Sequence, residues 1–376
     1  MEGGGMGILP DSDLTNMKRG ELFSQEVFWR DHQPWLKSCG YLLRPRYQPD
    51  WVASWIKDTS KEWPNCEDGE SLLYPDLNDA IRVSDGSLVM IKRLQLPHFR
   101  GEVEAGRFFS TEPLASDPRN HCIPFLDVLE IPDQDNAVLI VMPLLQDFGI
   151  PPFETIGEVV DFFGQLFEGL YFMHINKVAH RDCKFNNVMM DATKLYPSPP
   201  HPINLKKRRD YTGPATPTTR TLKPVKYYFI DFGLSRRYDL AAPLESRLEE
   251  PGWGGDDTVP EFTKGTPCDP FPVDVYCLGN LIRRHFLKGF HHIKAKRGLR
   301  FMDPLIADMT REDPKDRPTM EQVVKRFEEI RGQLSGWKLR SRLVDADESP
   351  ISGVFRSVVH WTKQVGLIGQ RVQPIP

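Results

Sequence analysis

The chain has 376 residues, 40% of them hydrophobic, so it can bury one large core or two smaller ones. Its formal net charge of −4 gives no electrostatic reason to expect nucleic acid or an anionic membrane as the main partner. The six cysteines form no C-x-x-C pair, which argues against a disulfide framework or a zinc cluster. We find no secretion signal and no apolar run of membrane-spanning length, and expect a cytoplasmic and/or nuclear protein.

Residues 1–20 are glycine-rich and polar, which predicts a disordered leader. Residues 21–68 are rich in aromatic side chains, and four of the eight tryptophans lie within 28–55, close to Arg44 and Arg46. Aromatic and basic side chains can stack on bases, but burial is the commoner use of tryptophan. We therefore predict a segment packed on the folded domain, and no nucleic-acid binding.

The next segment has strand-like sequence. AIRV and SLVMIKRL flank the turn signal Asp85-Gly86, which predicts a β-hairpin. Residues 101–110 have helical character, and DVLEI and AVLIVMPLL predict two further strands. Residues 69–145 are therefore expected to form a small β-sheet lobe with one helix.

Residues 146–335 are mainly helical in pattern, with apolar residues at three-and-four spacing from 159 to 175. An insertion at 192–226 has seven prolines, eight Lys/Arg and one acidic residue, which predicts a solvated loop. Its basic run at 206–209 could be a nuclear-localisation or anion-binding patch, although such runs are frequent in exposed loops.

Residues 336–376 form a tail with a predicted amphipathic helix. We expect the apolar face of this helix to dock on the helical lobe, because its flanks are not basic enough for a membrane surface. The face consists of Ile351, Val354, Phe355, Val358 and Val359.

The stretch HRDCKFNN, residues 180–187, resembles the catalytic loop of protein kinases, H-R-D-x-K-x-x-N. Phosphoryl transfer needs a carboxylate for the attacking hydroxyl, a cation beside the phosphoryl group and oxygen ligands for Mg²⁺. The resemblance implies that Asp182 orients the hydroxyl or accepts its proton, that Lys184 clamps the phosphoryl group and that Asn187 binds Mg²⁺.

Two further stretches resemble kinase motifs. YFIDFG, residues 228–233, places Asp231 as the second Mg²⁺ ligand. VMIK resembles V-A-I-K, which implies that Lys92 grips the phosphates of ATP and pairs with a helix carboxylate. Glu102 is the predicted partner, and Glu104 the second choice.

Downstream motifs complete the resemblance. Val259-Pro260-Glu261 resembles A-P-E, and the stretch beginning at Asp274 resembles D-x-W-x-x-G. In the family the A-P-E glutamate pairs with an arginine, so Glu261 and Arg317 are expected to form a buried ion pair. The implied fold is α+β and bilobal, with a small N-terminal β-sheet lobe with one helix and a larger helical C-terminal lobe. The tryptophan-rich leader with R-P-R-Y is similar to that of kinase-like proteins of basidiomycete fungi.

The sequence departs from the family at the nucleotide site. In place of G-x-G-x-x-G stands GESLLYPD, residues 69–76. Two missing charge-assisted hydrogen bonds would lower ATP affinity on the order of 10²–10⁴-fold. The remaining residues expected around adenine come from the strand-to-lobe connection and from a supporting position below it. They are Met142, Pro143, Leu145 and Met189.

The activation segment, residues 234–258, has six acidic and three basic residues. The resemblance implies that Arg181 binds a phosphorylated residue in this segment. Asp256 or Asp257 could serve as permanent substitutes for that phosphate.

The expected function is transfer of phosphate from ATP, with Mg²⁺, to Ser/Thr hydroxyls of a protein substrate, a basic protein being one candidate. One alternative is a pseudokinase that acts as a binding scaffold. A second is a small-molecule phosphotransferase, which Arg181, Glu261 and Asp274 disfavour because they belong to the protein-substrate platform. The substrate's identity and the oligomeric state are left open.

Overall fold

The computed structural model describes residues 19–96, 98–132, 134–251 and 256–375. Most of the predicted leader at 1–20 lies outside these residues. The described chain divides into two compact units. Unit 1 contains the described part of Met1–Leu96 with Phe125–Leu144 and Tyr196–Pro217, and unit 2 contains the described parts of Pro97–Pro124, Leu145–Leu195 and Thr218–Pro376.

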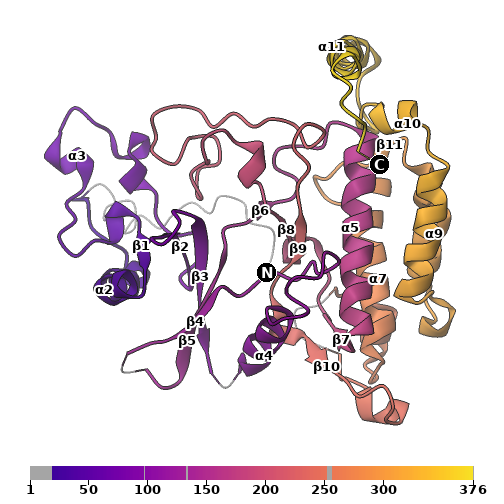
Figure 1. The fold of residues 1–376 in the computed structure, drawn as a ribbon, viewed down its shortest axis with the longest axis horizontal. Helices are drawn as coiled ribbons and strands as arrows, with labels where there is room; N and C mark the ends of the chain where they lie inside the picture. Colours follow the sequence, from indigo (N-terminus) through magenta and orange to yellow (C-terminus); the bar gives the residue numbers. More distant parts are fainter. Residues whose placement is uncertain (1–18, 97, 133, 252–255, 376) are drawn as a thin grey trace. The chain divides into compact units, whose positions relative to one another are not determined.

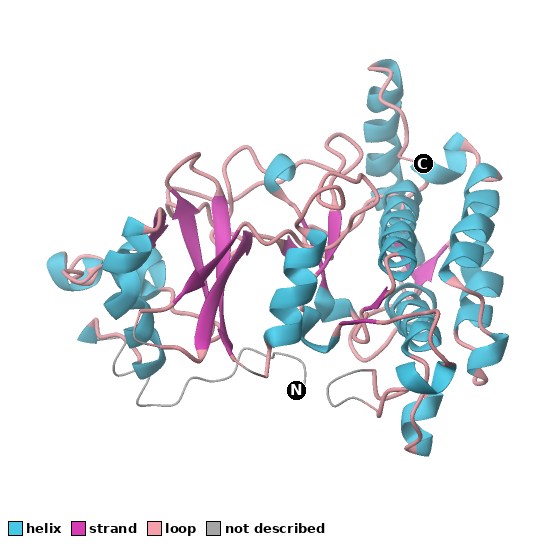
Figure 2. Cartoon of the chain, turned by 60° about the horizontal axis from the view of Figure 1, so that its bottom comes forward, coloured by secondary structure: helices cyan, strands magenta, loops and turns pink. Residues whose placement is uncertain are grey.

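Unit 1 is built on a twisted, five-stranded antiparallel sheet, drawn as magenta arrows in Figure 2. In spatial order its strands are β1 (Tyr41–Leu43), β2 (Leu77–Arg82), β3 (Leu88–Gln95), β5 (Ala137–Pro143) and β4 (Asp127–Glu130). The predicted hairpin at Asp85-Gly86 is confirmed as the β2–β3 turn. Gly86 has φ 72°, a left-handed conformation that glycine adopts without a Cβ clash.

Helix α2 (Ser24–Ser38) covers one face of this sheet. Its Trp29 and Leu36 are fully buried with Val89 and Ile91 of β3 and with alternate residues of β5. Alternation along a strand sends every second side chain to the same face, so the neighbouring residues of β3 point away from α2.

The aromatic-rich segment contributes a strand as well as packing. Strand β1 lies inside residues 21–68, which we predicted to precede the small lobe, and pairs with β2. Tyr47, just after β1, has no exposed surface, and α3 (Ser54–Lys57) buries Trp55. A three-residue strand is too short to show a periodic pattern in the sequence.

Unit 2 is mainly helical. Its long helix α5 packs against α9 (Figure 1). Thr155 caps α5 by accepting a hydrogen bond from the backbone N–H of Glu158, which satisfies one free donor of the first turn. The α-helices are α4 (Arg100–Phe109), α5 (Ile156–Ile175), α6 (Pro260–Lys264), α7 (Pro270–Ile282), α8 (Asp303–Met309), α9 (Met320–Gly332), α10 (Gly336–Arg340) and α11 (Pro350–Gly369).

Short strands connect these helices. A three-stranded sheet has the order β6–β8–β9, and two pairs join β7 with β10 and β11 with β12. Their bounds are β6 (Gln146–Asp147), β7 (Val178–Ala179), β8 (Val188–Met190), β9 (Tyr227–Phe229), β10 (Arg236–Arg237), β11 (Lys296–Arg297) and β12 (Val344–Asp345). Strands β7, β8 and β9 carry the loops that hold the candidate active site.

The predicted α+β class, with a β-sheet lobe and a larger helical lobe, is confirmed. The helix expected at 101–110 is α4, and the compact division groups it with unit 2. Among the described residues, no helix is both long enough and apolar enough to cross a bilayer.

The tail helix α11 forms, but the prediction that its apolar face docks on the helical lobe is wrong. Ile351 is 85% exposed and Phe355 71% exposed, whereas His360 and Gln364 are buried. The helix packs by the face of His360, Gln364 and Leu367, where His360 donates to the carbonyl of Arg340 and Gln364 accepts from the guanidinium of Arg340.

The insertion also differs from the solvated loop that its composition predicted. Its middle part, Tyr196–Pro217, belongs to unit 1, and His201 has no exposed surface. Residues 196–217 form no helix or strand of their own beyond two isolated β-bridges, so side-chain contacts hold this part in place.

Candidate active site

The predicted catalytic loop, residues 180–187, connects β7 to β8. Asp274 of α7 is fully buried and accepts hydrogen bonds from the backbone N–H groups of His180 (2.7 Å) and Arg181 (2.6 Å). Arg181 has φ 68°, which is costly for a residue with a side chain. Two charge-assisted hydrogen bonds that one carboxylate accepts therefore hold the loop in a conformation that the free chain disfavours.

Three predicted catalytic side chains meet in this loop. The Nζ of Lys184 lies 3.1 Å from Oδ2 of Asp182. The side-chain amide of Asn187 donates to the same oxygen at 2.7 Å and to the backbone carbonyl of Asp182 at 3.0 Å. The other oxygen, Oδ1 of Asp182, is buried and has no hydrogen-bond partner among the described residues. One carboxylate oxygen is thus fixed, and the other can accept a hydrogen bond from a substrate.

Burial raises the pKa of the Asp182 carboxyl, and Lys184 partly opposes this shift. Desolvation penalises the charged form, while a neighbouring ammonium favours it. A carboxylate in such surroundings is more basic than one in water, which suits a group that orients or accepts a hydroxyl proton.

Asp231 follows β9, next to the end of the catalytic loop. The backbone N–H of Ile230 donates to the carbonyl of Asn187 at 3.0 Å, and Val188 pairs with Phe229 across β8 and β9. Like Arg181, Asp231 is a non-glycine residue in the left-handed region, with φ 62°. These strands bring the chain segments of the two predicted Mg²⁺ ligands side by side.

The donor set fits Mg²⁺, which prefers carboxylate and amide oxygens and keeps positions open for phosphate and water. Asn187 directs its side-chain nitrogen to Asp182, so it offers its oxygen as a ligand. Asp231 offers a carboxylate.

Helix α4 places Glu102 beside this turn. Glu102 is 2% exposed, and its Oε2 lies 3.7 Å from where a Cβ on Gly233 would be. Oδ1 of Asp231 lies 3.4 Å from the same point. Glu104, the second choice for the lysine partner, is exposed. Unit 2 therefore brings Glu102 close to Asp231, and only the first-choice glutamate is buried.

The other predicted nucleotide residues divide between the units. In unit 1, Lys92 on β3 pairs in register with Ile140 of β5, and Met142 and Pro143 occupy the end of β5. In unit 2, Leu145 is buried, and Met189 lies in the middle of β8. The pairing of Lys92 with Glu102 spans the two units and stays a prediction.

A long connection contains the stretch that stands in place of G-x-G-x-x-G. Residues 44–76 join β1 to β2 and include the stretch 69–76. Arg44, at the start of this connection, forms a buried ion pair with Asp79 of β2 at 3.0 Å and donates to the carbonyl of Glu70 at 3.0 Å. The connection is therefore anchored to the sheet by side chains.

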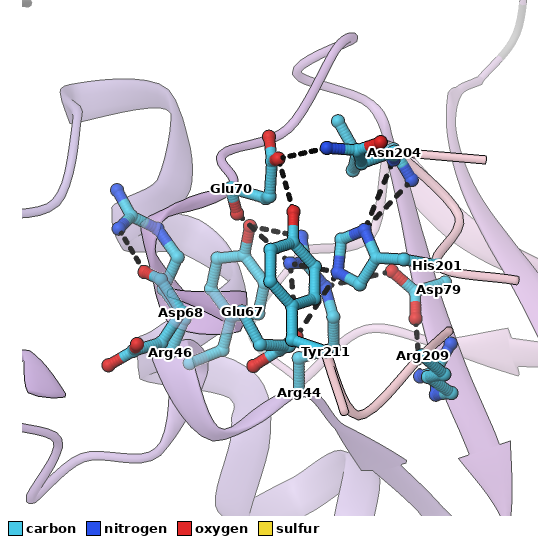
Figure 3. Close-up of polar contacts among 12 residues, drawn as sticks. Arg44, Arg46, Glu67, Asp68, Glu70, Asp79, His201, Asn204, Arg209 and Tyr211 are labelled. Carbon is cyan, nitrogen blue, oxygen red and sulfur yellow. Dashed lines mark hydrogen bonds and ion pairs between the residues drawn. The ribbon is translucent and has the colours of Figure 1, made fainter. Parts of the chain in front are cut away.

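The insertion adds contacts to the group formed by Arg44, Glu70 and Asp79 (Figure 3). Nε2 of the buried His201 lies 3.2 Å from Glu67 and 3.3 Å from Arg44. Two of the insertion's side chains donate to the carboxylate of Glu70, and a third pairs with Asp79 at 2.6 Å. These three are Asn204, Tyr211 and Arg209, in that order. The sequence pointed to none of these pairings.

The predicted ion pair of Glu261 and Arg317 is confirmed. The guanidinium and the carboxylate form two parallel hydrogen bonds of 2.8 and 2.7 Å, and both residues are buried. This bidentate geometry joins α6 to the turn before α9.

The acidic partner of Arg181 is not the one predicted. Asp256 instead contacts Asn280, Thr258 and Arg284, and Asp257 is exposed. Arg181 pairs with Glu249, at 3.3 Å. Asp256 is drawn away because it caps the turn at Thr258 through the backbone N–H and the hydroxyl.

Comparison with known proteins gives partial support for a family. No family model matches the chain. A stretch of 159 residues is 31% identical to the serine/threonine-protein kinase CAK1 of Saccharomyces cerevisiae. This match covers 39% of this chain and 34% of the length of the yeast protein. Together with the fold, this similarity supports a protein-kinase-like domain in this chain.

Proposed function

We propose that this chain is a serine/threonine-type protein kinase that transfers the γ-phosphate of ATP to hydroxyl groups of a protein substrate. The observation that carries the proposal is the pair of carboxylate oxygens of Asp182, one fixed by Lys184 and Asn187, the other buried without a partner among the described residues. A scaffold protein has no need for a buried carboxylate oxygen that accepts no hydrogen bond.

Each residue then has a physical task. Oδ1 of Asp182 accepts a hydrogen bond from the substrate hydroxyl, and Lys184 places a cation beside the transferred group. Asn187 and Asp231 hold Mg²⁺, which when bound neutralises charge on the phosphates. Lys92, positioned by Glu102, anchors the phosphates. The adenine ring contacts Met142, Pro143, Leu145 and Met189.

Three further points of the proposal rest on the sequence. They are a cytoplasmic or nuclear location, a basic protein as one substrate candidate, and the similarity to kinase-like proteins of basidiomycete fungi.

The test is Mg·ATP-dependent phosphorylation of a generic basic protein by the wild type and by Asp182→Asn. The amide keeps an oxygen to accept from Asn187 but is a far weaker base, so we expect a loss on the order of 10²–10⁴-fold. Asp161→Asn changes a half-buried carboxyl of α5 outside the proposed site, so it serves as the control and should keep its activity. Equal rates for the wild type and Asp182→Asn would reject the enzyme.

One observation favours the pseudokinase alternative. Residues 44–76 replace a short glycine-rich turn, and Pro75 in this connection has no backbone N–H to offer a phosphate. Nucleotide-dependent thermal stabilisation without any transfer would identify a pseudokinase.

A further inference from the structure

Arg181 links three parts of unit 2 through one side chain and its backbone. Its backbone N–H is bound to Asp274, and its Nη1 donates to the carbonyl of Leu234 at 3.1 Å, directly after the Asp231-Phe232-Gly233 turn. Its Nη2 lies 3.3 Å from Oε2 of Glu249. The residue next to Asp182 is thereby tied to the beginning and to a later point of the activation segment.

Glu249 has more donors than Arg181 alone. Nη1 of Arg236 lies 3.0 and 3.1 Å from its two carboxylate oxygens, and the hydroxyl of Tyr238 donates to Oε1 at 2.9 Å. The backbone of Glu249 also exchanges both hydrogen bonds with Cys268, at 3.0 and 2.9 Å. Side chain and main chain together fix this point of the segment.

The charges of this cluster suit a stronger anion than one carboxylate. Arg181 and Arg236 bring two positive charges to the single negative charge of Glu249. The side chains of Arg181 and Glu249 are only 12% and 16% exposed, so solvent screens their attraction less than at an open surface. Two guanidinium groups and a phenol are donors that would also bind a phosphorylated side chain, which carries about −1.5 to −2 charge.

We propose that Glu249 is a permanent acidic anchor that holds the activation segment on the catalytic loop, so that the chain needs no phosphate there. This inference rests on the proposed kinase function, whose regulation it describes. Glu249 is a positioning residue because it acts through Arg181 and touches no reacting atom. Its neutralisation leaves the largely buried guanidinium of Arg181 without its acidic partner and loosens the segment, which then keeps only the main-chain bonds to Cys268 at this point.

The experiment compares phosphatase-treated full-length proteins whose intact mass shows that no phosphate remains. The variants are Glu249→Gln, Glu249→Asp and, as a matched control, Glu250→Gln, which removes the charge of the exposed neighbour. Transfer to a protein substrate is measured with kcat and the KM for ATP determined separately. Hydrogen exchange of residues 236–250 is followed in the same samples.

We expect the dephosphorylated wild type to keep its activity within about twofold. Glu249→Gln should lose kcat by roughly ten- to a hundredfold, the equivalent of one or two charge-assisted hydrogen bonds, with little change in the KM for ATP. Its 236–250 peptides should exchange faster. Glu249→Asp should recover part of both effects because it keeps the charge, and Glu250→Gln should match the wild type.

Two results would overturn the proposed anchor role of Glu249. One is a loss of activity when the wild type is dephosphorylated. The other is a Glu249→Gln protein with the same kcat and the same hydrogen exchange as the wild type. If the wild type itself transfers no phosphate, the kinase proposal fails on its own account. Hydrogen exchange of residues 236–250 then tests the anchoring contact by itself. Equal exchange in Glu249→Gln and Glu250→Gln rejects this contact. Faster exchange in Glu249→Gln alone supports it.

Discussion

Asp182 has two features that favour its proposed chemistry and lower the stability of the folded protein. Its carboxylate is removed from water, and one of its oxygens has no partner among the described residues. Both features lower the stability of the charged form, yet both make the group a good acceptor for a substrate hydroxyl. Such opposition between stability and chemistry is expected at functional sites.

This opposition predicts that Asp182→Asn is more stable than the wild type at neutral pH. Because the folded pKa of Asp182 is raised, the folded state binds a proton more tightly than the unfolded state, and this contribution is lost as pH rises through the folded pKa. Thermal melts from pH 4 to 8 should show a higher Tm for the variant near pH 7 and a smaller difference in acid. A variant that is less stable at pH 7 would contradict this reading of the site.

The pKa of Asp161, a carboxyl outside the proposed site, is raised as well. Burial raises its pKa to about 6, from a reference of 3.8. Asp161→Asn should therefore raise the free energy of unfolding at pH 7 by about 1–3 kcal/mol. Chemical denaturation should show the gain develop between about pH 4 and 6 and then stay constant. A constant gain at every pH would mean that the side-chain shape, and not its charge, is responsible.

At the scale of elements, side-chain contacts decide where the irregular segments lie. The insertion and the β1–β2 connection carry complementary charges, and Arg44 and His201 are buried between them. Neither segment has a strand or helix ladder to fix it over most of its length. The insertion therefore acts as a brace for the stretch that stands in place of a glycine-rich loop.

Tyr211→Phe tests this brace by removing a single hydroxyl. That hydroxyl donates to the half-buried carboxylate of Glu70, and loss of a hydrogen bond to a charged group costs about 1–3 kcal/mol. We expect a lower free energy of unfolding and faster hydrogen exchange in residues 67–76. Lys206→Ala changes an exposed residue of the same insertion and is the control. Unchanged exchange in both variants would show that the insertion does not support the connection.

The Glu261–Arg317 pair tests a contact that the sequence did predict. Glu261→Gln leaves a buried guanidinium without its charge partner and should cost about 3–5 kcal/mol, measured by denaturant unfolding. Arg331→Gln, which breaks the exposed pair with Glu328, should cost about 1 kcal/mol or less. Similar losses in the two variants would mean that burial does not strengthen the first pair.

The sequence predicted best where local pattern and motif agree. The hairpin at Asp85-Gly86 and the Glu261–Arg317 pair needed only turn chemistry or the order of motifs. The partners of His201 lie more than a hundred positions away in the chain, and a Pro-rich basic segment gives no periodic signal for such contacts. The exposed face of α11 was missed for a related reason, because amphipathicity identifies a helix face but not the surface that will cover it.

At the scale of the whole molecule, the proposed function requires Lys92 of unit 1 and Asp231 of unit 2 to act on one nucleotide. Each unit supplies its part with ordinary secondary structure, since Lys92 lies on a central strand and Asp231 at the end of a paired one. The phosphate-covering loop is the part that is altered. Weak nucleotide binding is therefore expected even if every catalytic side chain is in place.

Thermal shift with Mg·ATP measures this weakness directly. A ligand that binds only the folded state stabilises it by RT ln(1 + [L]/Kd), so a Kd of about 1 mM gives only about 1 kcal/mol at 5 mM ligand. For a chain of this size that corresponds to a rise in Tm of about 1–2 °C. We expect this small shift at millimolar Mg·ATP, none at 50 μM, and none in Asp231→Asn, which lacks a charged ligand for the metal.

The outcomes separate the two candidate functions from a third. A clear shift at 50 μM would mean that residues 44–76 bind phosphates as well as a glycine-rich loop does, and the predicted affinity loss would be wrong. A millimolar shift with transfer supports the kinase, and the same shift without transfer supports the pseudokinase. If 10 mM Mg·ATP has no effect on the wild type while an aminoglycoside or another small substrate does, the small-molecule phosphotransferase becomes the better explanation, because the site would then recognise its acceptor before its nucleotide.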